Sequence, residues 1–462
     1  MFGKVRNFFV WGLLYYLRFF AWVALFLNRP KKIIGITGSV GKSSARNAVD
    51  AILRDHFKTM VVKQGNSETG VPLGILGINP GNYTFFDWLR IIFTCPFKID
   101  NLKGSEYLIV EMGIDSPLPP KNMDYLLTII KPDIAVVLNV YPVHTAQFDV
   151  LFKTIKNKVK KSKMILEKII EEKMKLITVG KPEIGIYNYN LKSASFVKAM
   201  EGKQNSNLIS FGKESNSDLV MLNHKVDLQK TNFEFLFKKE NRQFNLEINN
   251  YILPEGYGEV FAASILVGLE LGLTIEQIIF GLQKYFSLPA SRGSLFKGLK
   301  STLIIDSSYN ASREAVINFI DLTSDLSKQE KRPLVFVLGD MRELGDEARE
   351  EHMKIVERII EKKPNRVILT GPLTKKYILP VLKKRFRKTV KVKWLKTSIL
   401  AGEFLKRHLP YRGIILFKGS QNEIFLEEAV KKILKNKEDF KKLCRQNDFW
   451  LSKKRKFFLG NV

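Results

Sequence analysis

A glycine-rich segment near the N-terminus carries residue types suited to binding phosphate. It runs Gly35-Ile-Thr-Gly-Ser-Val-Gly-Lys-Ser-Ser44. The glycines let backbone N–H groups close around phosphate oxygens, Lys42 can reach the β- and γ-phosphates of a nucleotide, and the Ser43 hydroxyl can bind Mg²⁺. The strict G-x-x-x-x-G-K-S spacing is missed, because Ile36 stands where its first glycine would be. The segment still predicts a nucleotide-binding loop.

Such a loop needs a strand before it and a helix after it. Residues Ile33 to Ile36 are apolar and predict a short buried strand, and Ala45 to Leu53 have the apolar spacing of a helix. The start of that helix adds the positive end of its dipole to the loop. The local pattern therefore places the loop at the carboxyl end of a strand.

Further segments follow the loop in a fixed order and resemble motifs of the Mur ligase family. They are Asn66-Ser-Glu-Thr-Gly-Val-Pro-Leu73, Val110-Glu-Met-Gly113, Asn139-Val-Tyr-Pro-Val-His144, Asp306-Ser-Ser-Tyr-Asn-Ala311, Gly339-Asp-Met-Arg-Glu-Leu-Gly345 and Lys418-Gly-Ser420. The resemblance runs from about Lys32 to Lys435. It is strongest to the F-type subgroup, which adds D-alanyl-D-alanine to a uridine-nucleotide-linked muramyl tripeptide. That subgroup has an N-terminal uridine-nucleotide-binding domain. In this sequence the segment before Gly35 is too short to form such a domain.

The expected fold is α/β. Apolar runs alternate with helical stretches, and five strands after Leu303 alternate with helices, which predicts a doubly wound parallel sheet. The polar stretch Ser206–Asn249 predicts antiparallel hairpins. We expect a hydrophobic N-terminal helix (1–30), a central P-loop ATPase domain with a parallel sheet (31–292), a C-terminal Rossmann-like domain (293–440) and a basic aromatic tail (441–462).

The resemblance implies an ATP-dependent carboxylate–amine ligase that works through an acyl phosphate, in the synthesis of peptidoglycan precursors for the cell wall. The substrates would be a muramyl-peptide-like carboxylate and an amino acid or dipeptide amine, with ATP and Mg²⁺. Catalysis would involve Lys42, His144 and Lys163, and the metal ligands would be Ser43, Glu111, His144 and Lys163. The nucleotide would contact Gly38, Ser39, Gly41, Lys42, Ser43, Ser44, Asn139, Arg292 and Asp306.

Lys163 is assigned through a lysine that many Mur ligases carry as a CO₂-derived carbamate. The family's A-K-G-E-I-F segment resembles Ser162-Lys163-Met-Ile-Leu166, although Ile165 stands where the family has glutamate. A carbamate would turn the cation into an oxygen ligand, which a hard metal ion prefers. Nine lysines lie between Leu151 and Lys175, with Lys161 as the nearest rival.

Other positions depart from the family pattern. Ser307 replaces the second aspartate of D-D-S-Y-N-A, and Gln421 follows Lys418-Gly-Ser420 in place of arginine. The family's asparagines that read adenine are absent from the segment around Tyr257, where Tyr257 or Phe261 could stack on the base instead.

The segment Phe8–Leu27 is apolar except for Arg18, and nine of its twenty residues are aromatic. Three interpretations stay open: a transmembrane anchor, a helix lying in the membrane interface, or a helix docked on its own protein. The net charge of +29 favours anionic partners, but it is spread along the chain. We expect a monomeric cytoplasmic protein with no specific nucleic acid. Two of the three interpretations would attach it to the inner face of the membrane through 8–27.

Two alternative functions remain open. One is a polyglutamate or capsule-type amide ligase, because some such relatives also carry a hydrophobic N-terminus. The other is a membrane-associated ATP-binding scaffold whose ligase activity has decayed, which the altered ribose and adenine positions favour. Two cysteines exclude a disulfide framework and a four-thiolate zinc site.

Overall fold

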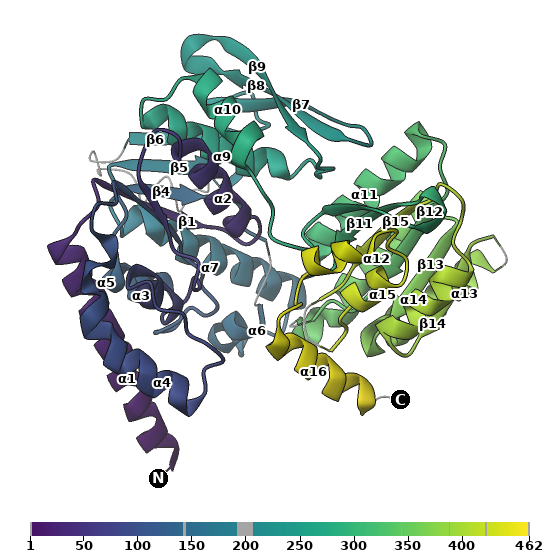
Figure 1. The fold of residues 1–462 in the computed structure, drawn as a ribbon, viewed down its shortest axis with the longest axis horizontal. Coiled ribbons are helices and arrows are strands. Elements are labelled where there is room, and N and C mark those ends of the chain that lie inside the picture. The colour runs from purple at the N-terminus through teal and green to yellow at the C-terminus, as the bar shows by residue number, and fades with distance from the viewer. Residues whose placement is uncertain are drawn as a thin grey trace. The chain divides into compact units, whose positions relative to one another are not determined.

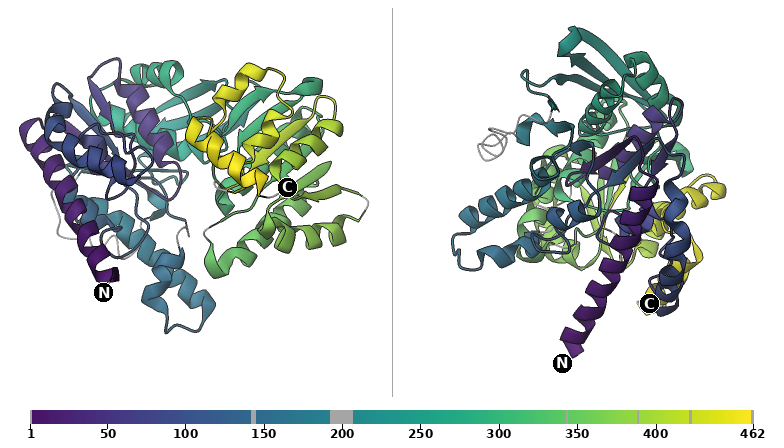
Figure 2. Two further views of the ribbon diagram at one scale, coloured as in Figure 1. Left: turned by 60° about the horizontal axis from the view of Figure 1, so that its bottom comes forward. Right: turned by 90° about the vertical axis from the view of Figure 1, so that its left-hand side faces the viewer.

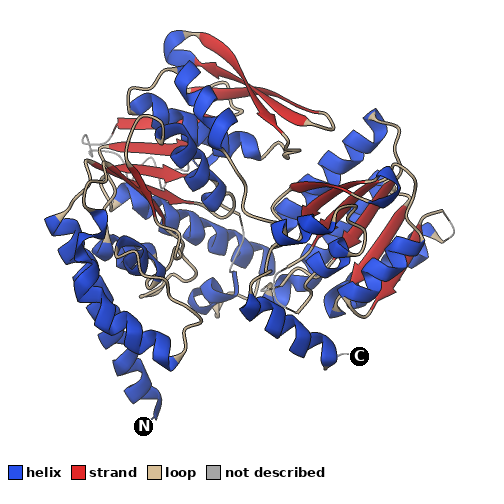
Figure 3. Cartoon of the chain, viewed as in Figure 1, coloured by secondary structure: helices blue, strands red, loops and turns tan. Residues whose placement is uncertain are grey.

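The computed structural model describes residues 2–141, 145–191, 207–342, 344–387, 389–420 and 423–460. Within them the chain divides into two compact units (Figure 1). The first holds most of residues 1–287, and the second holds residues 288–462 with two short stretches from the preceding hairpins, His224–Phe233 and Glu247–Tyr257. Each unit is built on one sheet with helices packed against it (Figure 3).

The first sheet has nine strands in the order β2-β3-β1-β4-β5-β6-β7-β8-β9. Its strands are β1 (Lys32–Thr37), β2 (Thr59–Val61), β3 (Tyr107–Glu111), β4 (Ile134–Val137), β5 (Ile184–Asn188), β6 (Asn207–Gly212), β7 (Leu219–Val226), β8 (Lys230–Phe237) and β9 (Arg242–Asn249). The pairs from β2 to β7 are parallel. Short turns join β7, β8 and β9, and such turns can connect only antiparallel neighbours. The predicted hairpins are therefore confirmed from β7 onward, whereas β6 belongs to the parallel part.

The helices of this unit lie on both sides of the parallel strands (Figures 1 and 2). They are α1 (Phe2–Leu27), α2 (Lys42–Leu53), α3 (Gly70–Ile75), α4 (Phe85–Thr94) with the 3₁₀ segment η1 (Cys95–Leu102), α5 (Met123–Ile129), α6 (Thr145–Phe148), α7 (Lys158–Thr178), α9 (Tyr257–Glu270) and α10 (Ile275–Tyr285). Helix α7 begins after Asn157, whose side chain accepts a hydrogen bond from Lys160 N and caps the helix there.

The second unit is the doubly wound sheet that the sequence predicts. Its order is β10-β11-β15-β12-β13-β14, with all pairs parallel except β10–β11. The elements are β10 (Ser294–Lys297), β11 (Leu303–Ser307), β12 (Leu334–Leu338), β13 (Arg366–Thr370), β14 (Lys391–Leu395), β15 (Ile414–Lys418), α11 (Arg313–Gln329), α12 (Ala348–Lys362), α13 (Leu379–Phe386), α14 (Ser398–Arg407), α15 (Glu427–Lys431) and α16 (Asp448–Leu459).

Strand β12 shows why this sheet needs helices on both faces. Leu334, Phe336 and Leu338 belong to one apolar cluster, with residues of α11, α12 and α13. The alternate residues Val335 and Val337 belong to another, with residues of α14 and α15. Because successive strand residues point to opposite faces, a continuous apolar strand is buried on both sides.

The C-terminal residues pack onto this second unit. Lys454 of α16 is almost fully buried, and its Nζ lies 2.8 Å from Glu427 and 2.7 Å from Glu428 of α15. Glu427 also forms a buried ion pair with Arg445, at 2.6 Å. Part of the basic charge expected in a tail is therefore used inside the fold.

Helix α1 packs against the first unit. Leu14, Leu17 and Ala21 are buried within its main apolar cluster. Tyr16 Oη donates a 2.7 Å hydrogen bond to the carbonyl of Ile92, and Arg18 donates to Thr128 Oγ1 at 3.1 Å. Among the described residues, Phe9–Leu27 is the one helical stretch long and apolar enough to cross a membrane. The structure thus supports a docked helix, although much of its other face stays exposed.

Candidate functional site: a phosphate loop with a hydroxyl–carboxylate pair

The glycine-rich segment forms the turn between β1 and α2, as its sequence predicts. Gly41 caps α2 in the left-handed conformation, with φ 86°, which favours glycine. It offers no side-chain cap, so the N–H groups of the first helical turn face a position that an oxyanion can occupy. A Cβ on Gly41 would lie 2.9 Å from Val260 Cγ2, which leaves no space for a larger residue.

Asn139 holds the loop from the neighbouring strand β4. Its side-chain oxygen accepts a 2.9 Å hydrogen bond from Val40 N, and its carbonyl accepts one of 2.9 Å from Ser39 N. Its amide donates to Glu259 of α9 at 3.1 Å, and burial raises the pKa of that carboxyl. Asn139 is thus a brace for the loop, and the sequence identified the residue although not this contact.

Lys42 lies folded over the loop. Its Nζ donates to the carbonyl of Gly38 at 2.8 Å and to that of Ser39 at 3.3 Å. Both acceptors belong to the loop that would surround a phosphate, so a small movement of the side chain would bring the ammonium to an incoming nucleotide.

Ser43 and Glu111 meet at the carboxyl ends of β1 and β3. Ser43 Oγ donates to Glu111 Oε2 at 2.9 Å, and Asn66 Nδ2 donates to Glu111 Oε1 at 2.9 Å. Arg46 lies 3.5 Å from the same carboxylate. The Thr37 hydroxyl at the end of β1 is fully buried and has no hydrogen-bond partner.

These oxygens fit a magnesium ion. Mg²⁺ is commonly held by one or two protein oxygens together with phosphate oxygens and water. Ser43 Oγ and Glu111 Oε2 converge beside the phosphate loop, which is where a metal bound to nucleotide phosphates would lie. Among the described residues, no group of three or more His, Cys, Asp or Glu side chains forms a metal cluster. His144, the predicted ligand of a second metal, lies outside the described residues.

Lys173 is a site residue that the sequence interpretation missed. It lies on α7, is buried, and its Nζ donates to the carbonyl of Gly38 at 3.2 Å. Burial and the nearby ammonium of Lys42 hold the pKa of Lys173 well below its usual range. A buried amine with a lowered pKa therefore lies against the phosphate loop.

The two other lysines considered on α7 face outward. The Lys163 side chain is exposed, and it precedes Lys173 by ten residues, or about 15 Å along a helix. Lys161 pairs with Asp149 at 3.1 Å. The apolar face of α7 predicts the position of Lys173, because Ile165, Ile169 and Lys173 recur every fourth residue and all three are buried.

The remaining predicted residues belong to the second unit. Asp306 is buried, accepts hydrogen bonds from Ser291 Oγ at 2.6 Å and Ser308 N at 3.0 Å, and has its pKa raised by burial. Arg292 stacks on Tyr309, with its guanidinium carbon 4.6 Å from the ring centroid, and its Nε is buried without a hydrogen-bond partner. That partnerless Nε is compatible with an anion contact.

Two residues considered for the adenine pocket differ in exposure. Phe261 is fully buried and packs edge-on against Phe286, so it cannot stack on a base. Tyr257 is only partly buried, and its hydroxyl donates to the carbonyl of Arg292 at 3.2 Å. Of the two, only Tyr257 keeps a ring that a ligand can reach.

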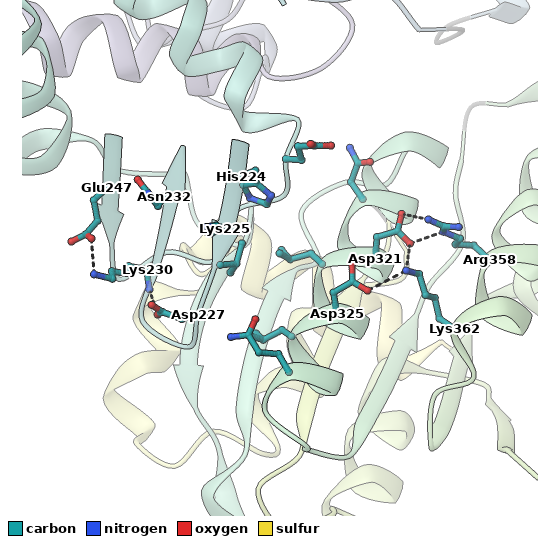
Figure 4. A pocket seen from close by; sticks show the side chains of 16 residues that line it. His224, Lys225, Asp227, Lys230, Asn232, Glu247, Asp321, Asp325, Arg358 and Lys362 are labelled. Carbon is teal, nitrogen blue, oxygen red and sulfur yellow. Dashed lines mark hydrogen bonds and ion pairs between the residues drawn. The ribbon is translucent and has the colours of Figure 1, made fainter. Parts of the chain in front are cut away.

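A separate hollow of about 800 Å³ lies in the second unit (Figure 4). Residues of β7, β8, β9, α11 and α12 line it, and none of the predicted site residues is among them. Many of its charges are paired, since Arg358 and Lys362 contact Asp321, and Lys230 contacts Glu247 at 2.6 Å. Nothing in its lining resembles a phosphate or metal site.

The phosphate loop on one parallel sheet and the second, doubly wound sheet define a nucleotide-binding α/β protein. Residues 36–251 match the Mur ligase middle domain, and residues 292–421 match the Mur ligase, glutamate ligase domain. The chain belongs to the Mur ligase family.

Its curated relatives include UDP-N-acetylmuramoyl-tripeptide–D-alanyl-D-alanine ligases. The Buchnera aphidicola ligase is 27% identical to this chain, and the match covers 74% of this chain and 64% of the ligase. The Rickettsia prowazekii ligase is 25% identical, and the match covers 85% of this chain and 76% of the ligase. The chain therefore spans just under two thirds of the Buchnera protein. The MurF ligase from Thermotoga maritima, solved in complex with ADP, shares the fold, with a TM-score of 0.68 at 23% identity over 91% of this chain and 83% of that one.

Proposed function

We propose that the protein is an ATP-dependent carboxylate–amine ligase of the Mur type, acting in peptidoglycan precursor synthesis. The observation that carries the proposal is the hydrogen-bonded pair of Ser43 and Glu111 beside Lys42 at the phosphate loop. These side chains supply the hydroxyl, carboxylate and cation that a nucleotide with a bound metal ion requires. The names of the curated relatives suggest a muramyl tripeptide and D-alanyl-D-alanine as substrates.

The chemistry would have two steps. A substrate carboxylate oxygen attacks the γ-phosphorus of ATP, which forms an acyl phosphate and releases ADP. An amine then attacks the acyl carbon, loses a proton and displaces phosphate, which leaves an amide. Two anions meet in the first step, so positive charge from Lys42 and the N-terminus of α2 lowers its barrier. Mg²⁺, held by Ser43 and Glu111, would screen the phosphate charge.

A lysine of α7 is proposed to carry the carbamate. The flanking sequence favours Lys163, whereas the surroundings favour Lys173, whose buried amine has a lowered pKa. Only the neutral amine adds to CO₂, giving an N-carboxylate and a proton. His144 is proposed as a second metal contact, and Arg292 and Asp306 as nucleotide contacts from the second unit.

The proposed setting is a cytoplasmic monomer held at the inner face of the membrane, with no specific nucleic acid. The test of function is phosphate release from ATP with muramyl peptides, screened against D-alanyl-D-alanine and single amino acids. Release that depends on both a carboxylate and an amine supports the ligase. Stimulation by glutamate with a polyglutamate acceptor would point to a capsule-type ligase, and no stimulation by any pair would favour a scaffold.

A further inference from the structure

Helix α1 carries two apolar stripes on opposite sides. The inner stripe is buried in the first unit and consists of Leu14, Leu17, Ala21 and Ala24. The outer stripe has the same helical spacing and consists of Tyr15, Phe19, Trp22 and Phe26. These outer side chains are 50%, 55%, 54% and 72% exposed. A helix whose only role was to cover the core of its own domain would need the inner apolar stripe but not the outer one.

Helix α4 and η1 present a second exposed stripe of the same kind. Its members are Phe86, Leu89, Phe93 and Phe97, and the three phenylalanines are at least 71% exposed. Thr84 and Asp87 form a capping box that starts α4, and Ile91 anchors its opposite side in the core. The stripe is therefore presented by a helix fixed at its start and on its inner side.

The two stripes lie on neighbouring helices. Tyr16 Oη of α1 bonds to the carbonyl of Ile92 in α4, and Asn28 Nδ2 at the end of α1 donates to the carbonyl of Ile99 in η1 at 3.3 Å. Figure 1 shows α1 and α4 next to each other at the same side of the first unit. The two exposed stripes thus belong to neighbouring segments of the first unit.

The chemistry of this surface matches an anionic lipid bilayer. Tyr, Trp and Phe are the side chains that settle at the membrane–water boundary. Residues 1–32 contain six Lys or Arg and no Asp or Glu, and the whole chain has a net charge of +29. Three of the six form ion pairs within the fold: Arg29 with Asp133, Lys31 with Glu106 and Lys32 with Glu183. Each basic residue near an anionic leaflet adds to binding. A second copy of this chain would bring the same positive charge and would be repelled.

We propose that α1 and the α4–η1 segment together form a docking surface on which the protein lies in the plane of an anionic membrane. This inference rests on the proposed location at the membrane and specifies how the protein is held there. If α1 spanned the membrane, it would have to leave the first unit. Leu14, Leu17 and Ala21 would then lose their contacts in the apolar core. The docked helix instead keeps its inner stripe buried and offers its outer stripe to lipid.

The test uses the full chain and vesicles of phosphatidylcholine with or without phosphatidylglycerol. Two double variants remove outer aromatics, Phe19→Gln with Trp22→Gln on α1 and Phe86→Gln with Phe93→Gln on α4. A control variant, Phe280→Gln with Leu400→Gln, removes side chains of 51% and 48% exposure from other helices. We expect each outer double variant to partition into anionic vesicles at least tenfold less than the unmodified protein. The control variant should partition as the unmodified protein does, and the circular dichroism spectra of all variants should stay unchanged.

The outcomes separate the inference from the proposals on which it rests. Loss of binding with the α1 pair but not the α4 pair would keep the membrane location and overturn the two-helix surface. Resistance of the membrane-bound protein to alkaline carbonate would show a spanning helix and overturn the in-plane arrangement. The unmodified chain could instead bind neither vesicle and form concentration-dependent dimers that both outer double variants abolish. That result would show that a second copy of this chain, and not a membrane, covers the outer stripes. Phosphate release measured in parallel tests the ligase chemistry independently.

Discussion

Ser43 Oγ donates a 2.9 Å hydrogen bond to Glu111 Oε2, although the two residues are 68 positions apart. One begins the helix after β1 and the other ends β3, and these strands are parallel neighbours. Parallel pairing brings their carboxyl ends to one edge of the sheet. The proposed metal site therefore depends on the fold of the whole unit, since neither residue could reach the other through local chain geometry.

Removing the charge of Glu111 should weaken the response to magnesium. Glu111→Gln keeps the shape and can still meet the Ser43 hydroxyl, but it offers a neutral oxygen to the metal. We expect the magnesium concentration for half-maximal phosphate release to rise at least tenfold. Glu106→Gln is the matched control, because Glu106 precedes the same strand and contacts Lys31 at 2.6 Å instead. An unchanged magnesium dependence in Glu111→Gln would remove this residue from the metal site.

Removing Lys42 should abolish ligation without unfolding the protein. Its ammonium contacts the loop carbonyls of Gly38 and Ser39 and lies outside the apolar core. We expect Lys42→Ala to lower ATP-dependent amide formation by at least 100-fold with an unchanged melting temperature, while Lys31→Ala, at an exposed position, keeps its activity. Normal turnover in Lys42→Ala would contradict the assignment of the phosphate loop.

The two lysines of α7 can be distinguished by paired substitutions. We expect Lys173→Ala to lose most of the ligase activity and to recover part of it with added formate or acetate, which can fill the vacated oxygen position. Lys163→Ala, an exposed change, should retain its activity. The reverse pattern would assign the carbamate to Lys163. If Lys173→Met retains activity, the buried amine has only a packing role.

Lys418 makes stability depend on pH. Burial, together with the nearby charge of Arg292, lowers the pKa of this lysine to about 7. Between pH 7 and the ordinary value of 10.5, the unfolded chain binds a proton that the folded chain does not, so stability rises with pH across that window. We expect Lys418→Met to flatten this rise in urea titrations between pH 7 and 10. A slope equal to that of the unmodified protein would show that Lys418 stays charged when folded.

Two neighbouring positions on α1 should differ sharply in their effect on stability. Leu17 is fully buried, whereas Phe19 is 55% exposed. We expect Leu17→Ala to lower the free energy of unfolding by about 2–5 kcal/mol, and Phe19→Ala to change it by about 0.5 kcal/mol or less. Equal small effects would mean that α1 leaves the first unit in solution.

Local patterns predicted much of the first site. The loop, the strand before it and the helix after it follow from residue spacing between Ile33 and Leu53, and the structure confirms all three. Five of the six strands of the second sheet, those from Leu303 onward, were also predicted. These features depend on periodicity and on glycine positions, which neighbouring residues determine.

What the sequence did not reveal depends on tertiary burial. Lys173 is one of nine lysines in its region, and only packing against the phosphate loop distinguishes it. The burial of Phe261 likewise follows from its position on α9, where its neighbours Val260, Ala262 and Ala263 are also buried. For α1, periodicity alone could not decide which of two equally apolar stripes would find a partner within the chain.

The double-sided character of α1 has a consequence for synthesis. The helix is complete once Leu27 has been added, but its partners in η1 and α5 end at Leu102 and Ile129. At about 5–20 residues per second, translation needs roughly 5–20 s to reach the end of α5. Throughout that interval both stripes of the nascent helix are open. The inner stripe of α1 therefore becomes buried only after the elements that cover it have been translated.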